Sequence, residues 1–213
     1  IVFGDWSSDV CSSDLRAQKV FSHDSAWLAL KDIRAVKTYH APRIDGHPDD
    51  TVWKKAPVAG DFVEYMPRNK ARPPYPTEIR FLYDNSALYV LAVMYDPHPD
   101  SICRELGRRD QLEALNNDYI SVDILPYNDG LNMYEFKVNP SNIQHECKYS
   151  AVGQDLSWDA VWESATAISD SAWVAELRIP WSALRFPATE EQVWGINMWR
   201  NHQRYQEIGR AHV

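Results

Sequence analysis

The chain has 213 residues, of which 45% are hydrophobic, and a formal net charge of -8. This length and apolar content can build one substantial core, whereas the acidic balance, without a Lys/Arg cluster beyond Arg108 and Arg109, argues against a nucleic-acid-binding surface. No apolar run reaches the roughly 18 residues of a membrane-spanning helix, and the three cysteines are too isolated to indicate a zinc site or a disulfide framework.

The two ends differ in composition from the rest of the sequence. "SSDVCSSDL" at residues 7–15 is rich in Ser and Asp without periodicity, and together with the terminal "EIGRAHV" it resembles translated sequencing-adapter DNA. We therefore expect residues 1–15 and 207–213 to be artefacts that pack against little, and residues 16–32 to be a lead-in to a domain over 33–206. The chain is expected to be a fragment that has lost any export signal.

"RIDGHPDDTVWKKA", residues 43–56, is the first segment with a distinctive pattern. Its three carboxylates could bind a cation or act in catalysis, but Asp and Gly are also the residues that turns require. We favour the turn, in which Asp45 and Gly46 reverse the chain, Asp49 and Asp50 cap a short helical turn, and Trp53 packs beneath the domain.

Beyond this segment the hydrophobic period is two, which is typical of β-strands. The predicted strands are "TEIRFLYD", "ALYVLAVMYD", "DYISVDIL", "MYEFKVNP", "AVWESATAI", "AWVAELRIP" and "WGINMWR". Helical structure is expected only as one or two turns in "DSICRELGRRDQLEALN" and as a short turn after Pro180. Many short strands separated by Pro, Asp, Asn and Gly turns predict an all-β fold, a β-sandwich of antiparallel sheets that is immunoglobulin-like or jelly-roll-like.

The order of these segments resembles the family 9 carbohydrate-binding module. The resemblance covers residues 33–206 and is closer for the module found at the N-terminus of bacterial proteins of mostly unknown function, because "RRD" at 108–110 and "WDAVW" at 158–162 also match. In those proteins the C-terminal part is predicted to be an outer-membrane barrel. The resemblance thus implies a glycan or small saccharide as ligand, a barrel in the same full-length protein as partner, and export to the periplasm, outer membrane or surface of a bacterium.

Sugar binding requires aromatic faces for the pyranose ring and fixed polar groups for its hydroxyls. Trp199 lies opposite the apolar face of its strand, so it is a good surface candidate. Trp158 and Trp162 lie four residues apart across an expected turn and strand start, where they could form a binding platform or belong to the core.

The resemblance assigns further ligand-binding residues and one departure. Sugar-binding members clamp the ligand between two tryptophans; Leu115 stands at the first place, and the second lies beyond residue 206. Lys137 replaces an arginine, which keeps a donor but loses the bidentate fork. Asn139 and Asn197 match polar positions of the family.

A structural Ca²⁺ ion is the cofactor that the resemblance implies; no organic cofactor is expected. Asp96, Asp100 and Asp118 lie at predicted strand ends, where calcium ligands would be placed. The alternative is that they cap loops, since no single run has the alternating oxygen ligands of a calcium-binding loop.

Catalysis has little support in the sequence. Glu135, Glu163 and Glu176 fall on separate predicted strands, where we expect them to face solvent, and no hydrolase, zinc-protease or nucleotide-binding motif occurs. We predict a non-catalytic carbohydrate-binding module of a larger exported bacterial protein. The alternative is an accessory interaction or plug-like domain of an outer-membrane barrel protein without a sugar site; an exposed Trp158 and Trp162 pair favours the module, and a buried pair with a flat apolar patch favours the alternative.

Overall fold

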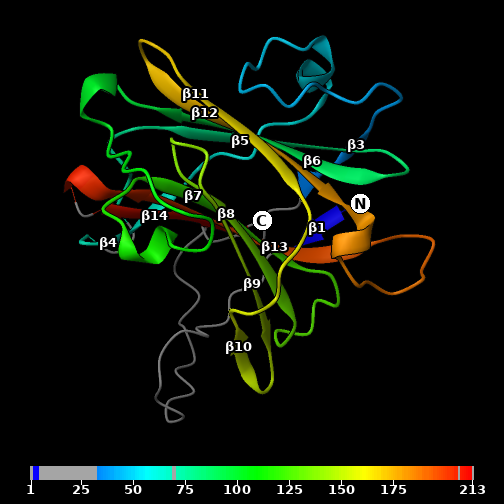
Figure 1. Cartoon of the computed structure of the whole chain (residues 1–213). Helices are drawn as coiled ribbons and strands as arrows, with labels where there is room; N and C mark the ends of the chain where they lie inside the picture. The colour runs from blue at the N-terminus through cyan, green and yellow to red at the C-terminus, as the bar shows by residue number, and fades with distance from the viewer. Residues whose placement is uncertain (1, 5–32, 69–70, 206, 213) are drawn as a thin grey trace.

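A computed structural model describes residues 2–4, 33–68, 71–205 and 207–212, which form two β-sheets packed against each other (Figure 1). The strands of the larger sheet are β1 (Val2–Gly4), β2 (Ile33–Arg34), β4 (Val63–Met66), β7 (Tyr119–Leu125), β8 (Met133–Val138), β9 (Gln144–Ser150), β10 (Gly153–Asp155), β13 (Val193–His202) and β14 (Glu207–His212). Their order is β10-β9-β8-β7-β13-β1-β2, and β14 pairs with both β13 and β4.

The smaller sheet packs over one face of the larger one. Its strands are β3 (Val36–Lys37), β5 (Thr77–Tyr83), β6 (Ala87–Tyr95), β11 (Glu163–Ile168) and β12 (Ala172–Pro180). Their order is β11-β12-β6-β5-β3, and every pair is antiparallel except β3 with β5. The prediction of an all-β sandwich is confirmed.

Short 3₁₀ turns are the helical elements of the described residues. They are η2 (Thr51–Lys55), η3 (Pro99–Ser101), η4 (Leu112–Ala114), η5 (Trp181–Ala183) and η6 (Gln203–Tyr205). The turns expected between residues 100 and 116 and after Pro180 are thus present. No helix of the described part is long and apolar enough to cross a bilayer.

The main core lies between the sheets and comes from every second residue of their strands. On β6, Val90 and Met94 point inward with no exposed surface, while Tyr89 and Leu91 point to the opposite face and are also buried. Such a strand reads as apolar on both faces because both faces are covered.

The segment that begins at Arg43 covers the outer face of the smaller sheet. Trp53 from η2 is 2% exposed and packs against Tyr89, Leu91 and Val174. Its Nε1 donates a 3.0 Å hydrogen bond to Glu176 on β12, a carboxylate with no exposed surface. The prediction that Glu176 faces solvent is therefore wrong, because the segment from Arg43 to Ala56 covers that face of the sheet.

The aspartates of this segment shape a turn, as predicted. Gly46 has φ +82, and a Cβ there would lie 2.8 Å from the backbone carbon of Thr166, so the close approach requires glycine. The capping role expected for Asp50 is wrong: its Oδ2 accepts the backbone N–H of Arg43 at 2.7 Å and makes no side-chain bond to η2. Arg43 is also hydrogen-bonded to Asp49 at 3.1 Å.

The C-terminal segment is part of the larger sheet. β14 pairs with β13 from Asn197 opposite His212 to His202 opposite Glu207, and Ala211 is 3% exposed within the main core. The expectation that residues 207–213 pack against little is therefore wrong for 207–212. At the other end, the backbone of β1 pairs with β13 and β2; the rest of the predicted 1–15 artefact and the 16–32 lead-in lie outside the described residues.

Candidate functional site

The outer face of the larger sheet carries polar side chains over β7, β8 and β13. Alternation along β7 sends Ile120, Val122 and Ile124 into the core and turns Ser121 and Asp123 to the other side. β8 and β13 follow the same alternation. We call this surface the polar face; its members are Ser121, Asp123, Glu135, Lys137, Asn197 and Trp199.

Hydrogen bonds and an ion pair hold each of the two carboxylates of the polar face in place. Nζ of Lys137 lies 2.6 Å from Oε1 of Glu135, and Tyr149 donates a 3.1 Å hydrogen bond to Oε2 of the same carboxylate. Asp123 accepts the hydroxyl of Ser121 at 2.7 Å and the indole N–H of Trp199 at 2.8 Å. The polar groups are therefore held in fixed positions.

Two carboxylates and one lysine make this network short of positive charge. Burial raises the pKa of Asp123 to about 7, and the neighbouring charge of Glu135 acts in the same direction. Glu135 itself is only 7% exposed, so the prediction that it faces solvent is wrong. The network can donate hydrogen bonds from Lys137 and accept them at carboxylate oxygens, which is the chemistry that sugar hydroxyls require.

Aromatic rings border the polar face at Trp199, which is half-buried. The ring of Tyr65 from β4 meets the indole edge-on, with centroids 5.6 Å apart and an interplanar angle of 88°. The Arg210 guanidinium from β14 lies 4.5 Å from the indole centroid. We call Tyr65, Trp199 and Arg210 the aromatic rim. Tyr65 and Arg210 were not predicted from the sequence, because no local pattern indicates that β4, β14 and β13 lie side by side.

The two other candidate tryptophans lie on the opposite face of the sheet. Trp158 packs against Tyr134 and Phe136, with centroids 5.2 and 5.8 Å apart, and these rings belong to the core side of β8. Trp162 is 5% exposed and donates a 2.9 Å hydrogen bond to Glu146. The structure thus gathers Trp199, Lys137 and Asn197 on one face and places Trp158 and Trp162 elsewhere.

Asn139 follows β8 and stabilises a turn. Its Oδ1 accepts the backbone N–H groups of Ser141 and Ile143 at 3.1 and 2.8 Å, and its Nδ2 donates to the carbonyl of Glu105 at 3.2 Å. The side chain has no exposed surface. These bonds account for the residue at this position without a ligand.

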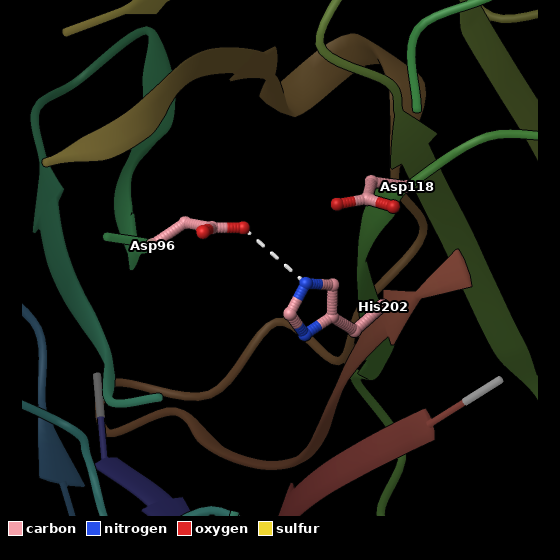
Figure 2. A group of neighbouring side chains, drawn as sticks. All are labelled: Asp96, Asp118 and His202. Atoms are coloured by element: carbon pink, nitrogen blue, oxygen red, sulfur yellow. Dashed lines mark ion pairs between the residues drawn. The ribbon is translucent and has the colours of Figure 1, made fainter. Parts of the chain in front are cut away.

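The carboxylates predicted to bind calcium divide into a buried pair and an exposed residue. Asp96 and Asp118 lie with His202 in a group whose candidate ligand atoms are all within 4.8 Å of one another (Figure 2). Oδ2 of Asp96 is 3.3 Å from Nε2 of His202. Asp100 is exposed on η3 and is not a member of this group.

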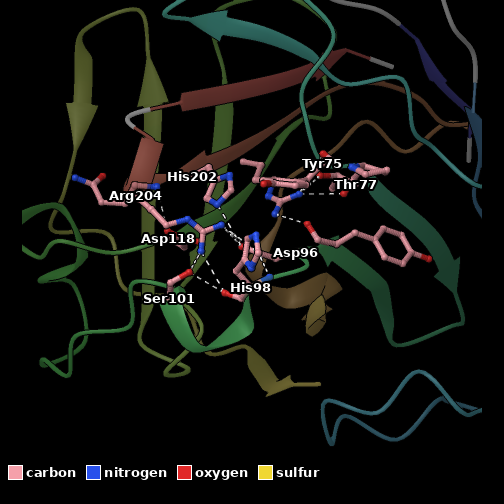
Figure 3. A network of polar contacts seen from close by, with 12 residues as sticks. Tyr75, Thr77, Asp96, His98, Ser101, Asp118, His202 and Arg204 are labelled. Carbon is pink, nitrogen blue, oxygen red and sulfur yellow. Dashed lines mark hydrogen bonds and ion pairs between the residues drawn. The ribbon is translucent and has the colours of Figure 1, made fainter. Parts of the chain in front are cut away.

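A guanidinium already compensates one of the two buried carboxylates. Nη2 of Arg204 is 3.0 Å from both oxygens of Asp96 (Figure 3). Burial raises the pKa of Asp118 to about 6, and burial together with Arg200 lowers that of His202 to about 4. These residues suit calcium poorly, because the ion prefers an all-oxygen shell and Asp96 is engaged by a cation; the calcium site stays a prediction.

The three glutamates considered for catalysis lie on the outer faces of the two sheets, Glu135 on the larger sheet and Glu163 and Glu176 on the smaller one. Glu135 belongs to the polar face and Glu176 is buried on the outer side of the smaller sheet. Glu163 is exposed on β11 and pairs with Arg178 at 2.7 Å. These three do not form the opposed carboxylate pair of a glycosidase.

Sequence comparison gives one family and no individual relative. The profile of the family described as "Carbohydrate family 9 binding domain-like" matches residues 44–212. No curated protein sequence matches the chain.

Comparison with solved structures finds the same fold at low identity. A family 9 carbohydrate-binding module from Caldicellulosiruptor kristjanssonii in complex with cellotriose is similar over 84% of this chain and 83% of its own, with 16% identity and a TM-score of 0.58. A family 9 module from the same organism in complex with glucose is similar over 84% of this chain and 85% of its own, with 18% identity and a TM-score of 0.56. A Bacteroides uniformis ATCC 8492 protein proposed to bind carbohydrate is similar over 84% of this chain and 88% of its own, with 10% identity and a TM-score of 0.65.

Proposed function

Because the chain belongs to the carbohydrate family 9 binding domain-like family, we propose that it is a non-catalytic saccharide-binding module whose site is the polar face beside the aromatic rim. The observation that carries the proposal is the contact between Trp199 and Asp123, which places an indole ring directly beside a buried network of charged hydrogen-bonding groups. An aromatic surface next to a few fixed polar groups is the usual composition of a sugar site. The complexes of similar modules with cellotriose and glucose support the same ligand class.

Each group of the site has a distinct role in this proposal. Lys137 donates to a sugar hydroxyl, and Asp123 and Glu135 accept from hydroxyls. Because Asp123 and Lys137 are 3% and 6% exposed, water screens their hydrogen bonds weakly, and little conformational freedom is lost on binding. Trp199 contributes its apolar ring at the edge of the network.

The proposed site is weak, because a single tryptophan contributes to it. Arg210 covers one face of that indole, and Leu115, at the place of the second clamp residue, follows η4 as a half-buried side chain. One partly covered ring and a few hydrogen bonds leave a small surplus over the cost of association. We expect dissociation constants of about 1 mM for mono- and disaccharides, equivalent to roughly 4 kcal/mol.

Calorimetric titration with glucose, cellobiose and cellotriose tests this site. Trp199→Ala and Lys137→Met should each weaken binding roughly ten-fold, the size expected for losing a ring contact or a charge-assisted hydrogen bond. Lys54→Met is the matched control, because Lys54 is exposed on η2, in the segment that covers the outer face of the smaller sheet. Equal affinity of Trp199→Ala and wild type would place the sugar elsewhere.

The larger setting proposed is an exported bacterial protein that carries this module together with an outer-membrane part. Its support is the resemblance of the segment order, and the full reading frame on both sides of the chain would test it. The alternative is an interaction domain without a sugar site, which the buried position of Trp162 favours. Failure to bind any glycan, with an intact fold, would support that alternative.

A further inference from the structure

A pocket of about 310 Å³ lies at Trp158, on the side of the larger sheet opposite to the polar face. It opens where β8 and β9 meet the segment before β11 and the η5 turn. We call it the Trp158 pocket; the lining residues used below are Tyr134, Lys148, Trp158, Asp159, Ser182 and Arg185. Its volume is at the small end of the roughly 300–1,000 Å³ of ligand pockets, which suits one or two sugar units.

The indole of Trp158 forms a fixed aromatic wall of this pocket. Its contacts with Tyr134 and Phe136 hold one side of the ring against the core, while the residue as a whole is half-buried. A ring held in this way offers a flat apolar surface at little conformational cost. The arrangement accounts for a tryptophan that is neither fully in the core nor on the polar face.

Two cations line the pocket, and among the described residues neither forms an ion pair within 4.0 Å. Lys148 lies opposite the exposed Asp155 in the register of β9 and β10 and acts on its carboxylate only electrostatically. A guanidinium nitrogen of Arg185 is 3.3 Å from the carbonyl oxygen of Leu184, and Nζ of Lys148 lies 5.9 Å from the centroid of the Tyr134 ring. The carboxylate that lines the pocket, Asp159, is instead 3.8 Å from Arg109. In a chain with a net charge of -8, two such cations beside an aromatic wall indicate an anionic ligand.

We propose that the Trp158 pocket binds a uronic acid residue of an acidic glycan. The pyranose ring stacks on Trp158, and its carboxylate pairs with Arg185 and Lys148. Asp159 and the hydroxyl of Ser182 are placed to hydrogen-bond ring hydroxyls. An aromatic acid would use the wall and the cations but would leave these two groups without partners, so a sugar acid fits the lining better. This second site does not depend on the polar face.

NMR titration of the full chain, observing indole N–H signals, tests the pocket with glucuronic and galacturonic acids against glucose and galactose. We expect the uronic acids to shift the Trp158 signal and to bind more tightly than the neutral sugars, with an affinity that falls at high salt. Arg185→Gln should weaken uronate binding roughly ten-fold, as expected for loss of a charge-assisted hydrogen bond, and Arg185→Lys should restore part of it. Arg178→Gln is the matched control, since Arg178 pairs with Glu163 across β11 and β12.

The outcomes separate this pocket from the proposed polar-face site. Trp199→Ala should leave uronate binding unchanged, and Arg185→Gln should leave neutral-sugar binding unchanged. Equal binding of uronic and neutral sugars, tighter binding of benzoate than of glucuronate, no effect of Arg185→Gln, or no binding of any acid would overturn the proposal. Loss of uronate binding in Trp199→Ala would assign the acid to the polar face and would also overturn it.

Discussion

Nε1 of Trp199 donates a 2.8 Å hydrogen bond to Oδ2 of Asp123, a residue 76 positions earlier in the sequence. The bond joins β13 to β7 across their outer faces and fixes the orientation of the indole. Replacing Trp199 by Phe would keep an aromatic ring but remove a donor from a buried carboxylate. Such a loss costs about 1–3 kcal/mol.

We therefore expect Trp199→Phe to lower the free energy of unfolding by that amount in urea denaturation. In the Asp123→Asn background the same substitution should cost less, because a neutral amide is less demanding than a carboxylate when it loses a partner. Additive effects of the two substitutions would show that the bond contributes nothing to stability.

Stability should fall as pH rises through the titration range of Asp123. Burial raises its pKa to about 7 in the folded protein, above its usual value near 3.9, so the folded state holds the proton more tightly than the unfolded chain. The contribution is fully present below the unfolded pKa and is lost between about pH 4 and pH 7. Asp123→Asn should flatten this slope in urea denaturation series; part of it should remain, because burial also raises the pKa of Asp118, to about 6. Identical slopes would contradict the assignment.

Replacement of Glu176 should lower the free energy of unfolding more than replacement of most other polar residues. Its carboxylate accepts the backbone N–H groups of Asp45 and Gly46 at 3.0 and 2.9 Å and the indole N–H of Trp53 at 3.0 Å. Glu176→Ala would leave these donors without their acceptor, and we expect a loss of about 3–5 kcal/mol. Glu163→Ala is the matched control on an exposed ion pair, with an expected change of about 0–1 kcal/mol. If Glu176→Ala lowers the free energy of unfolding no more than Glu163→Ala does, the segment from Arg43 to Ala56 is held by packing alone.

Arg204 should prevent Ca²⁺ from binding at Asp96. Since the guanidinium engages both carboxylate oxygens, we expect neither CaCl₂ nor EDTA to shift the Tm of the wild-type protein. Arg204→Ala should be less stable, and Ca²⁺ should raise its Tm by binding the native state. A wild-type Tm that rises with Ca²⁺ and falls with EDTA would contradict this expectation and would support the calcium site predicted from the sequence.

Removal of residues 207–213 should destabilise the protein. The truncation would leave one edge of β13 unpaired and take Ala211 out of the core, so we expect a loss of at least about 2 kcal/mol from the backbone hydrogen bonds alone. Ala211→Asp, which buries a charge at the same place, gives a point test if the shortened chain does not fold. Deletion of Val213 alone serves as the control. Unchanged Tm values for the truncated chain and for Ala211→Asp would show that β14 is dispensable.

The strands of the two sheets were predictable, because the burial of every second residue gives their sequences a hydrophobic period of two. Trp53 was also placed correctly, since a large aromatic residue after a turn of Asp and Gly has few places to go other than the core. β14 was missed for the opposite reason: "EIGRAH" is short and polar, and its composition pointed to a foreign origin.

Most of the candidate site depends on contacts that no local pattern records. Glu135 and Glu176 were expected at the surface because strand alternation gives two faces and does not tell which additional segment covers the outer one. The contact of Tyr65 with Trp199 joins β4 to β13 across β14, which requires knowledge of the strand order. The opposite orientations of Trp158 and Trp199 likewise follow only from the position of each ring relative to the larger sheet.

The position of β14 between β13 and β4 has a consequence for the order in which the chain acquires its parts. Tyr65 and Trp199 are brought together across β14, which comes later in the sequence than every other strand of the described residues, and Arg210 on that strand completes the aromatic rim. During synthesis the rim can therefore form only after β14 has been made, which is also when Ala211 completes the main core. A nascent chain released from the ribosome only up to η6 would contain the polar face and the Trp158 pocket but would lack the rim beside Trp199.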